Sequence, residues 1–330
     1  MRKALVRTLV ELAEKDPRVL LMTADLGYNF LEPFAERFPD RFFNVGVAEQ
    51  NLVGLATGLA DEGFIPYVYS IATFAALRPY EFIRNGPVLQ RLPVRIVGVG
   101  GGFEYDHAGP THYALEDVGA LRMQPGLQVI APADFEQCRS AVLAVHAMPG
   151  PAYLRLGKDE TYTVPGLAGR FEPGRAHVVR QGADALFIAM GPSVASALRA
   201  ADLLAAQGLE STVMVVACIS PPPMEDLRAV LTRFPWAVTV EAHYAVGGLG
   251  SLVCEAAAEI GSGCRVIRCG VTRNPSGEQG GQEFMQRLHG ISPEHLVEAA
   301  LRARRESGAP AVPASDWKAA ASIPVPKSTP

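Results

Sequence analysis

The sequence has no excess of charge of either sign and no long apolar run. Its 330 residues carry 30 lysines and arginines against 34 aspartates and glutamates, a formal net charge of −4. Such a balance creates no positive field that would attract nucleic acid or an anionic membrane surface, so we expect neither as a partner. No stretch of about eighteen apolar residues is present, which predicts that no segment spans a membrane.

Cysteine is scarce and unpaired. The five cysteines are odd in number and form no CxxC motif, so they predict neither a disulfide framework nor a zinc site. We expect them to be small buried side chains, and we expect no metal ligands in this chain. The segment from Met1 to Glu14 has the pattern of an amphipathic helix and not of a signal peptide, which predicts a cytoplasmic protein. The cysteines are Cys138, Cys218, Cys254, Cys264 and Cys269.

Apolar residues are plentiful, at 48% of the sequence, and in a chain of this length they suffice for two cores. Short β-branched runs alternate with helical stretches, which predicts mostly parallel sheets with helices on both faces. We expect two consecutive α/β domains, over residues 1–160 and 176–305, joined by a linker over residues 161–175. The Ala-, Pro- and Ser-rich composition of residues 306–330 predicts a disordered tail.

The strand pattern is clear enough to assign individual segments. Those expected in the first domain are 19–22, 42–45, 65–69, 94–99, 128–131 and 152–156. Those expected in the second domain are 185–190, 212–217, 237–240 and 265–268. Pro221, Pro222 and Pro223 should end the second strand of that domain and form a rigid turn before a helix.

One candidate for chemistry is Glu49, which follows a predicted strand and begins a predicted helix. Parallel α/β sheets bind ligands at the carboxyl ends of their strands, so Glu49 lies where a reactive group is expected. The same position also suits a purely structural acid, because the helix dipole favours negative charge in the first turn by a few tenths of a kcal/mol. These residues alone leave both interpretations open.

A second candidate is the glycine-rich segment from Gly98 to His112, directly after a predicted strand. Such a loop is typical of a close approach to a ligand, although it also fits a flexible surface turn. Phe103 occupies the last glycine position of a GxGxxG fingerprint, so a nicotinamide-dependent dehydrogenase is poorly supported. A plain turn does not explain the cluster of Glu104, Asp106, His107 and His112.

Together these motifs resemble the transketolase family, in the family's order and over roughly residues 1–305. The resemblance implies a pyrimidine-binding domain followed by a transketolase C-terminal domain. It further implies transfer of a two-carbon ketol unit between sugars or sugar phosphates with thiamine diphosphate. The motifs are Thr23-Ala24-Asp25-Leu26, Asn44 to Asn51, Phe74 with Arg78-Pro79-Tyr80-Glu81, Gly109 to Asp117, Ala131-Pro132-Ala133-Asp134, Tyr153-Leu154-Arg155, and Val240-Glu241-Ala242-His243 with Gly247 to Gly250.

The resemblance also implies roles for single residues. Glu49 matches the glutamate that shares a proton with N1′ of the cofactor's aminopyrimidine. Phe74 is expected to stack on that ring, with Tyr69 as a further cofactor contact. His112 matches the family's substrate-facing histidine and is the second catalytic residue expected.

The remaining substrate contacts implied are Asp25, Asp106, His107, Arg155 and Arg2. Arg155 matches an arginine that binds the acceptor's phosphate, for which a planar, permanently charged fork is well suited. Arg2 is expected as a second anchor, with Lys3 and Arg7 as alternatives one turn away.

Two features depart from the family pattern. No Gly-Asp-Gly motif occurs in the sequence, so the diphosphate and Mg²⁺ are expected to bind mainly to a partner subunit that carries the GDG…N site, in an α₂β₂ heterotetramer. The acid that precedes the Pro-Thr-His segment in the family is replaced by Ala108. Asp106 is a candidate to replace it from a shifted loop.

Other functions stay open at this point. Within the same cofactor class these are a 1-deoxyxylulose-phosphate-synthase-like enzyme and the β subunit of a 2-oxoacid dehydrogenase. The Gly-Pro-Thr-His segment and Arg155 favour ketol transfer over the dehydrogenase but do not exclude the synthase. A non-catalytic regulatory subunit is expected to lose the acid or the aromatic residue, whereas Glu49 and Phe74 are both present.

Overall fold

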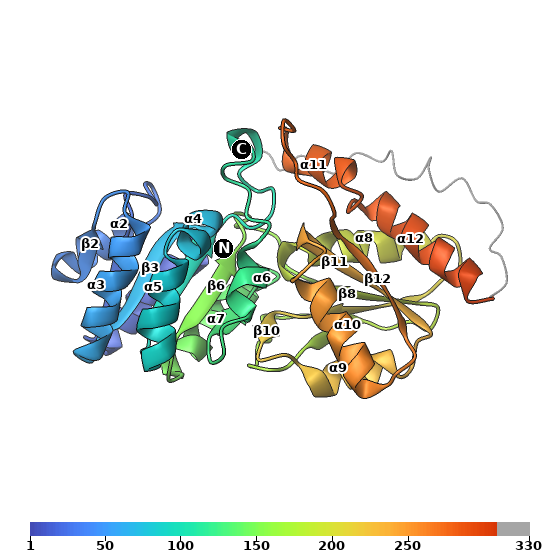
Figure 1. Ribbon diagram of the computed structural model, residues 1–330, viewed down its shortest axis with the longest axis horizontal. Helices are drawn as coiled ribbons and strands as arrows, with labels where there is room; N and C mark the ends of the chain where they lie inside the picture. The colour runs from blue at the N-terminus through green and yellow to red at the C-terminus, as the bar shows by residue number, and fades with distance from the viewer. Residues whose placement is uncertain (309–330) are drawn as a thin grey trace.

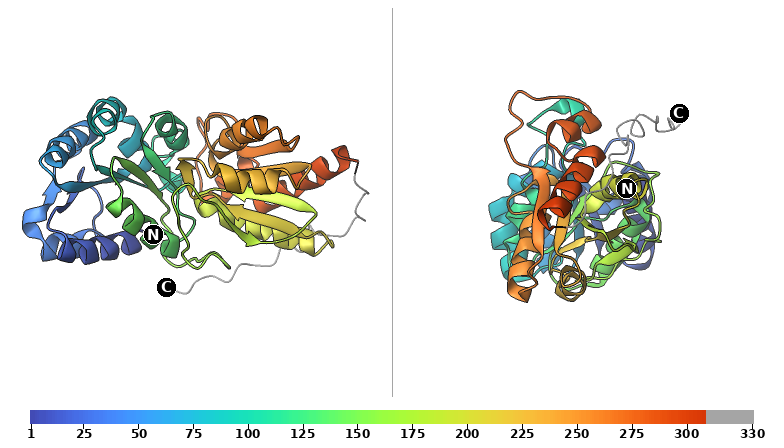
Figure 2. Two further views of the ribbon diagram at one scale, coloured as in Figure 1. Left: turned by 90° about the horizontal axis from the view of Figure 1, so that it is seen from below. Right: turned by 90° about the vertical axis from the view of Figure 1, so that its right-hand side faces the viewer.

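Two twisted sheets, one in each of two α/β domains, form the framework of the protein, whose computed structural model describes residues 1–308 (Figure 1). The domains lie side by side along the long axis of the molecule (Figure 2). The predicted fold class, two consecutive α/β domains with mostly parallel sheets, is confirmed.

The first sheet has seven strands in the order β10-β5-β6-β4-β3-β1-β2, all parallel except β10. The central strands are buried along their whole length, as expected for a parallel sheet covered on both faces. Strands β1 and β2 end in register, since Thr23 pairs with Asn44, while β3 continues to Ile71 beyond the pairing of Thr23 with Tyr69. The strands are β1 (Val19–Thr23), β2 (Phe42–Asn44), β3 (Ile65–Ile71), β4 (Arg95–Val99), β5 (Gln128–Ile130), β6 (Ala152–Leu156) and β10 (Cys218–Ser220).

Helices cover both faces of the first sheet. Helix α1 (Arg2–Lys15) packs against α7 (Phe135–Ala147) and α2 (Glu32–Arg37) on one face. The opposite face carries α3 (Glu49–Asp61), α4 (Ala72–Leu77), α5 (Tyr80–Ile83) and α6 (Asp117–Arg122), with a π-helical turn at Arg84–Val88 after α5. Short 3₁₀ turns lie at Pro39–Arg41 and Asp106–Ala108.

The second sheet has five strands in the order β12-β11-β8-β9-β7, with β7 antiparallel to β9. Its strands are β7 (His177–Arg180), β8 (Ala185–Ala189), β9 (Ser211–Val215), β11 (Trp236–Tyr244) and β12 (Arg265–Val271). Its helices are α8 (Val194–Ala205), α9 (Met224–Leu231), α10 (Leu249–Ile260), α11 (Gln282–Leu288) and α12 (Pro293–Glu306), with a 3₁₀ turn at Gly191–Ser193.

One strand crosses between the domains. The strand expected over residues 212–217 is β9, which ends at Val215, and the chain then forms a separate strand that was not expected, β10, which joins the first sheet antiparallel to β5. The sequence hides this change of sheet because both strands are buried and therefore equally apolar. The edge strand β7 was not expected either. The part of the expected tail from residue 309 onward lies outside the described residues.

The two domains share apolar cores. One cluster joins Leu52 and Val118 of the first domain to Leu227 and Leu249 of the second. All five cysteines are free; four are buried, as expected, and Cys254 is half-buried. Among residues 1–308, no helix combines the length and apolarity that crossing a bilayer requires.

Candidate active site

The expected site residues of the first domain gather where its strands end. The chain leaves β1 at Thr23 and β2 at Asn44, two positions that lie side by side in the sheet. Asp25 lies just after β1, Glu49 begins α3 after β2, and Phe74 follows β3 in α4. This is the carboxyl edge at which parallel sheets bind ligands.

Glu49 is a buried acid and not a surface one. Helix α3 begins at Glu49, as predicted, yet the residue is only 3% exposed. Its Oε1 accepts a hydrogen bond from the Ser70 hydroxyl at 3.0 Å, and its Oε2 accepts one from Arg78 at 2.8 Å. An acid present only for the helix dipole would remain in water, since burying a charge is costly unless it is paired. The burial of Glu49 is compensated by these two bonds, and its functional role stays a prediction.

Phe74 connects Glu49 to His112. Its ring is half-buried, and the guanidinium carbon of Arg78 lies 3.7 Å from the ring centroid. The His112 ring meets the edge of Phe74, with the two ring centres 5.1 Å apart and the planes at 62°. Residues separated by some 60 positions in the sequence therefore form one group: an acid, a cation, an aromatic ring and an imidazole.

His112 presents one ring nitrogen to a potential ligand. Its Nδ1 lies 2.9 Å from the Thr111 hydroxyl, and the centres of the His112 and Tyr105 rings are 6.0 Å apart. Within residues 1–308 no hydrogen bond engages its Nε2. The half-buried imidazole can therefore donate or accept a hydrogen bond at Nε2.

Asp25 is held in a strained turn beside the same strand ends. Its φ of +57° is uncommon for a residue other than glycine. The carboxylate accepts hydrogen bonds from Tyr28 at 2.6 Å and from the Asn44 amide at 2.8 Å. These bonds, that from Tyr28 above all, lower the pKa of Asp25 below its usual range. Asn44 also accepts from the backbone N–H of Gly46, which ties this turn to the segment ahead of Glu49.

The glycine-rich loop proves to serve internal packing. A Cβ on Gly101 would lie 2.5 Å from the guanidinium carbon of Arg155, and one on Gly102 would lie 2.6 Å from Ala242 of the second domain. These glycines therefore make room for the protein's own side chains. At Gly101 and Gly102 the space that a Cβ would need is taken by the protein itself, and a close approach of this loop to a ligand stays a prediction.

Arg155 has a different place from the one expected for a phosphate anchor. It is 3% exposed, and its Nε donates to Asp117 at 2.8 Å. Its Nη2 donates to the carbonyls of Ala114 at 2.8 Å and of Ala242 at 3.0 Å. Burial favours the neutral form of Asp117, but the charges of Arg155 and His243 and the hydrogen bonds from Arg155 and Tyr153 together lower the pKa of that carboxyl. Arg155 thus bridges the two domains, and we correct its assignment.

Two further residues that were expected to contact the cofactor or the substrate, Tyr69 and Arg2, contact other residues of the protein. Tyr69 is 4% exposed within the apolar core, where burial raises the pKa of its phenol, so its assignment as a cofactor contact is also corrected. Arg2 stacks over Phe30, with 3.7 Å between its guanidinium carbon and the ring centroid. Its Nε lies 3.4 Å from Glu160.

Asp106 and His107 lie on the outer part of the His112 loop. Asp106 has a φ of +39°, and its Oδ1 is buried without a hydrogen-bond partner in the described part of the chain. His107 and Ala108 are exposed. The backbone carbonyls of Asp106 and His107 accept hydrogen bonds from Tyr113 and Gln279, which the sequence did not suggest.

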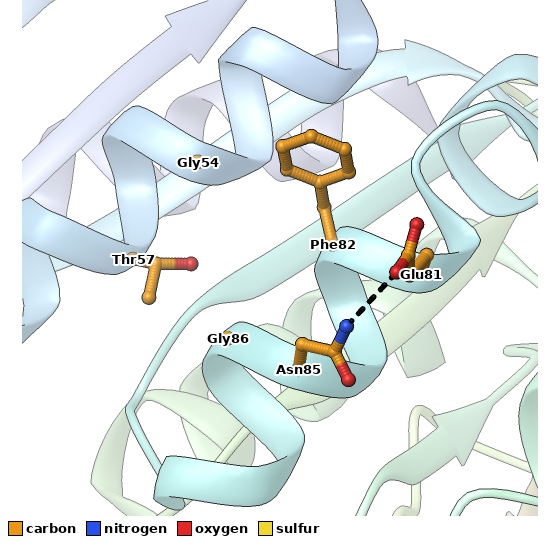
Figure 3. Close-up of a pocket in the computed structure, with 6 residues that line it drawn as sticks. All are labelled: Gly54, Thr57, Glu81, Phe82, Asn85 and Gly86. Carbon is orange, nitrogen blue, oxygen red and sulfur yellow. Dashed lines mark hydrogen bonds between the residues drawn. The ribbon is translucent and has the colours of Figure 1, made fainter.

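A cavity of about 320 Å³ opens on another face of the first domain, between α3 and the helical turns after Pro79 (Figure 3). It contains none of the expected site residues. Phe82, which is 41% exposed, supplies its main apolar surface. The cavity is lined by Gly54, Thr57, Glu81, Phe82, Asn85 and Gly86.

No three His, Cys, Asp or Glu side chains of residues 1–308 gather as a set of metal ligands. A buried carboxylate, a half-buried aromatic ring and a histidine lie together at the carboxyl edge of a parallel sheet, where α/β proteins commonly bind ligands. Two family models match the chain: the transketolase pyrimidine-binding domain over residues 1–163 and the transketolase C-terminal domain over residues 174–296. The chain therefore belongs to the transketolase family, as its motifs predicted.

Relatives include both subunits and longer enzymes. The 6-deoxy-6-sulfo-D-fructose transketolase subunit SqwH of Clostridium sp. (strain MSTE9) is 34% identical over 303 residues, which cover 91% of this chain and 93% of that protein. The 1-deoxy-D-xylulose-5-phosphate synthase of Syntrophotalea carbinolica is 36% identical, over 88% of this chain and 46% of that enzyme. A solved split-gene transketolase, an inactive β₄ tetramer, is 36% identical with a TM-score of 0.82, over 92% of this chain and 97% of that one.

Proposed function

We propose that this chain is one subunit of a thiamine-diphosphate-dependent transketolase that transfers a two-carbon ketol unit between sugars or sugar phosphates. The observation that carries the proposal is the buried Glu49 carboxylate near the half-buried ring of Phe74, with His112 at the edge of that ring. The site lies at the carboxyl edge of the sheet in a chain of the transketolase family.

The residues present fit the aminopyrimidine of thiamine diphosphate. In this structure a flat, N–H-bearing group, the Arg78 guanidinium, already stacks on Phe74 while it donates to Glu49. An aminopyrimidine needs the same pair of contacts, an aromatic face and a carboxylate at its edge. Arg78 is 43% exposed, so its side chain is able to move aside.

Bound thiamine diphosphate supplies a nucleophilic carbon and an electron sink for the two-carbon fragment. Glu49 holds a proton at the edge of the pyrimidine, and the Ser70 hydroxyl orients its other oxygen. His112 donates from Nε2 to a substrate oxygen that gains charge, since Thr111 engages Nδ1. The ionised carboxylate of Asp25, from the neighbouring strand end, accepts a hydrogen bond from a substrate hydroxyl.

We further propose that a second chain, carrying the GDG…N motif, binds the diphosphate and Mg²⁺, and that the two chains form an α₂β₂ enzyme in the cytoplasm. The split-gene transketolase and the SqwH subunit support a partner chain by analogy. Exposed apolar side chains on α3 and on the helical turns after Pro79 are suited to receive it, because Leu55, Phe82 and Leu89 are 46%, 41% and 74% exposed, and Phe82 also lines the cavity of Figure 3.

The test combines calorimetry with a transfer assay. We expect the purified chain to be folded, to bind thiamine diphosphate and Mg²⁺ no better than millimolar, and to be inactive alone. Stacking and one hydrogen bond amount to a few kcal/mol at most before the ligand is immobilised. Addition of the partner chain should produce ketol transfer. Micromolar binding and turnover by the chain alone would contradict the need for a partner.

The donor substrate distinguishes a transketolase from the alternative, a 1-deoxyxylulose-phosphate-synthase-like enzyme. A transketolase uses a ketose donor and releases an aldose, whereas the synthase uses a 2-oxoacid donor and releases CO₂. The assembled enzyme should be assayed with both donors under the same conditions. CO₂ release in the absence of ketol transfer would replace the present proposal with the synthase.

A further inference from the structure

The loop that carries His112 belongs to the first domain by sequence but to the second by packing. Phe103, Tyr113 and Leu115 are each no more than 2% exposed and lie in the apolar core of the second domain, with Ala242 and Met285. In Figure 1 this loop rises beside the segment that leads into α11. The second domain therefore contacts the loop along most of its length.

The base of the loop is tied by backbone hydrogen bonds. Gly102 and Ala114 exchange two, at 2.9 and 3.0 Å, which closes the loop across its neck. Tyr244 of the second domain then donates its backbone N–H to Leu115 at 2.9 Å. A short ladder thus links the loop to the end of β11.

An aromatic stack holds the middle of the loop. The rings of Phe103 and His289 are stacked, with their centres 5.1 Å apart and the planes at 23°. Tyr113 meets the edge of Phe103 at 5.0 Å. The His289 side chain is 1% exposed, and its Nε2 lies 2.9 Å from Oε2 of Glu278. Burial lowers the pKa of this imidazole.

The outer turn is held by Gln279. Its side-chain amide donates to the carbonyl of His107, and a Cβ added at Gly109, two residues further on, would lie 3.8 Å from the Gln279 amide carbon. The carbonyl of Gly109 in turn accepts from the backbone N–H of His112 at 2.9 Å. Gln279 therefore holds the turn at His107, and the same turn is bonded at Gly109 to the backbone of His112.

We propose that residues 272–281 of the second domain form a positioning element for the substrate site, in which Gln279 sets the place of His112 relative to Phe74. The element acts through the loop and not on substrate directly, so its loss should alter substrate selectivity more than the activation of the cofactor. This inference rests on the proposed function, because it takes His112 as the substrate-facing residue.

The test uses a matched pair of substitutions. Gln279→Met keeps the length of the side chain but removes the donor, and Gln279→Lys restores a donor of similar reach. Gln282→Met is the control, because the Gln282 side chain makes no hydrogen bond within the described residues. All variants should retain the thermal stability of the parent within a few degrees.

Two measurements distinguish a failure of this inference from a failure of the proposed function. In the purified chain, hydrogen–deuterium exchange of residues 104–112 should be faster in Gln279→Met than in the parent and return toward it in Gln279→Lys. In the assembled enzyme, kcat/KM for ketol transfer should fall about three- to tenfold, the range expected for one lost hydrogen bond, mainly through KM. Proton exchange at the cofactor's C2 should stay at the parental rate.

Parental exchange over residues 104–112 together with parental kcat/KM in Gln279→Met would overturn the inference. An equal effect of Gln282→Met would also overturn it, because the change would then be unspecific. If the parent enzyme transfers no ketol unit, the proposed function fails, and parental or altered loop exchange in Gln279→Met still decides whether Gln279 holds the loop.

Discussion

At the scale of single residues, Glu49 is distinguished by what surrounds it. Its two carboxylate oxygens are bonded by a buried hydroxyl, from Ser70, and by a half-exposed cation, from Arg78. A buried acid with one movable partner can exchange that partner for a ligand, whereas an acid with two buried partners cannot. The arrangement therefore suits a proton relay at the edge of a bound ring.

Glu49→Gln should stop proton exchange without preventing cofactor binding. Glutamine keeps the size and hydrogen-bonding reach of the residue but cannot take up and return a proton. We expect hydrogen–deuterium exchange at C2 of thiamine diphosphate in the assembled enzyme to fall about 10²- to 10⁴-fold. Asp61→Asn, at the exposed end of the same helix, is the control. An unchanged exchange rate in Glu49→Gln would remove Glu49 from the mechanism.

Arg155→Met should lower the free energy of unfolding. The substitution leaves the buried carboxylate of Asp117 without its cation, which typically costs about 3–5 kcal/mol in the free energy of unfolding. Urea denaturation of the purified chain measures this cost. The double variant Arg155→Met/Asp117→Leu should recover much of the loss, because no uncompensated charge is left. Full stability of Arg155→Met combined with weaker binding of phosphorylated acceptors would restore Arg155 to the substrate site.

At the scale of elements, the loop after β4 carries a second buried acid. Glu104 is 7% exposed and accepts a hydrogen bond from the backbone N–H of Lys158 at 2.9 Å. Burial raises its pKa from 4.5 to about 7, although this hydrogen bond and the charges of Arg155 and Lys158 oppose the shift. The folded chain thus keeps a proton that the unfolded chain has released between pH 4.5 and 7.

The stability supplied by Glu104 should therefore fall as the pH rises through this window and level off above pH 7. Glu241, whose pKa burial also raises to about 7, acts in the same direction, so the variant must be compared with the parent. Between pH 5 and pH 8 the unfolding free energy of Glu104→Gln should drop by about 1–3 kcal/mol less than that of the parent. Urea titrations at both pH values provide the measurement.

The exposed Glu283→Gln is the control and should follow the parent at both pH values. A parental pH dependence in Glu104→Gln would show that Glu104 keeps an ordinary affinity for protons in the folded state.

At the scale of the whole molecule, exposed apolar side chains lie on both domains but differ in their surroundings. Leu89 is 74% exposed and follows the π-helical turn that lines the cavity of Figure 3. Val246 is equally exposed, at 76%, but lies in the second domain between β11 and α10. Substitution of each residue therefore tests which of these two surfaces binds the partner chain.

Leu89→Asp should weaken assembly with the partner chain at least about tenfold, because a charge would have to be buried in an apolar contact. The fold should be unaffected, since the side chain is exposed. Analytical ultracentrifugation of the mixed chains measures association, and circular dichroism checks the fold. Val246→Asp should assemble normally. Equal assembly of both variants with the parent would place the partner on a different surface.

The sequence by itself determined the features that depend on local pattern. The β-branched runs and helical periods were sufficient for two α/β domains and for the start of α3 at Glu49. The order of the motifs was sufficient for the family. Such features are readable because each depends on residues within one strand or one turn of helix.

Only the tertiary structure decided which polar residues meet. Arg155 bonds Asp117, 38 positions away, and the backbone of Ala242, 87 positions away, so its local motif could not show that it is an internal bridge. Gln279 reaches the His112 loop from 172 positions away, and β10 joins the sheet of the other domain. The physical reason is that burial and pairing depend on distances in space, which the pattern of neighbours along the chain does not contain.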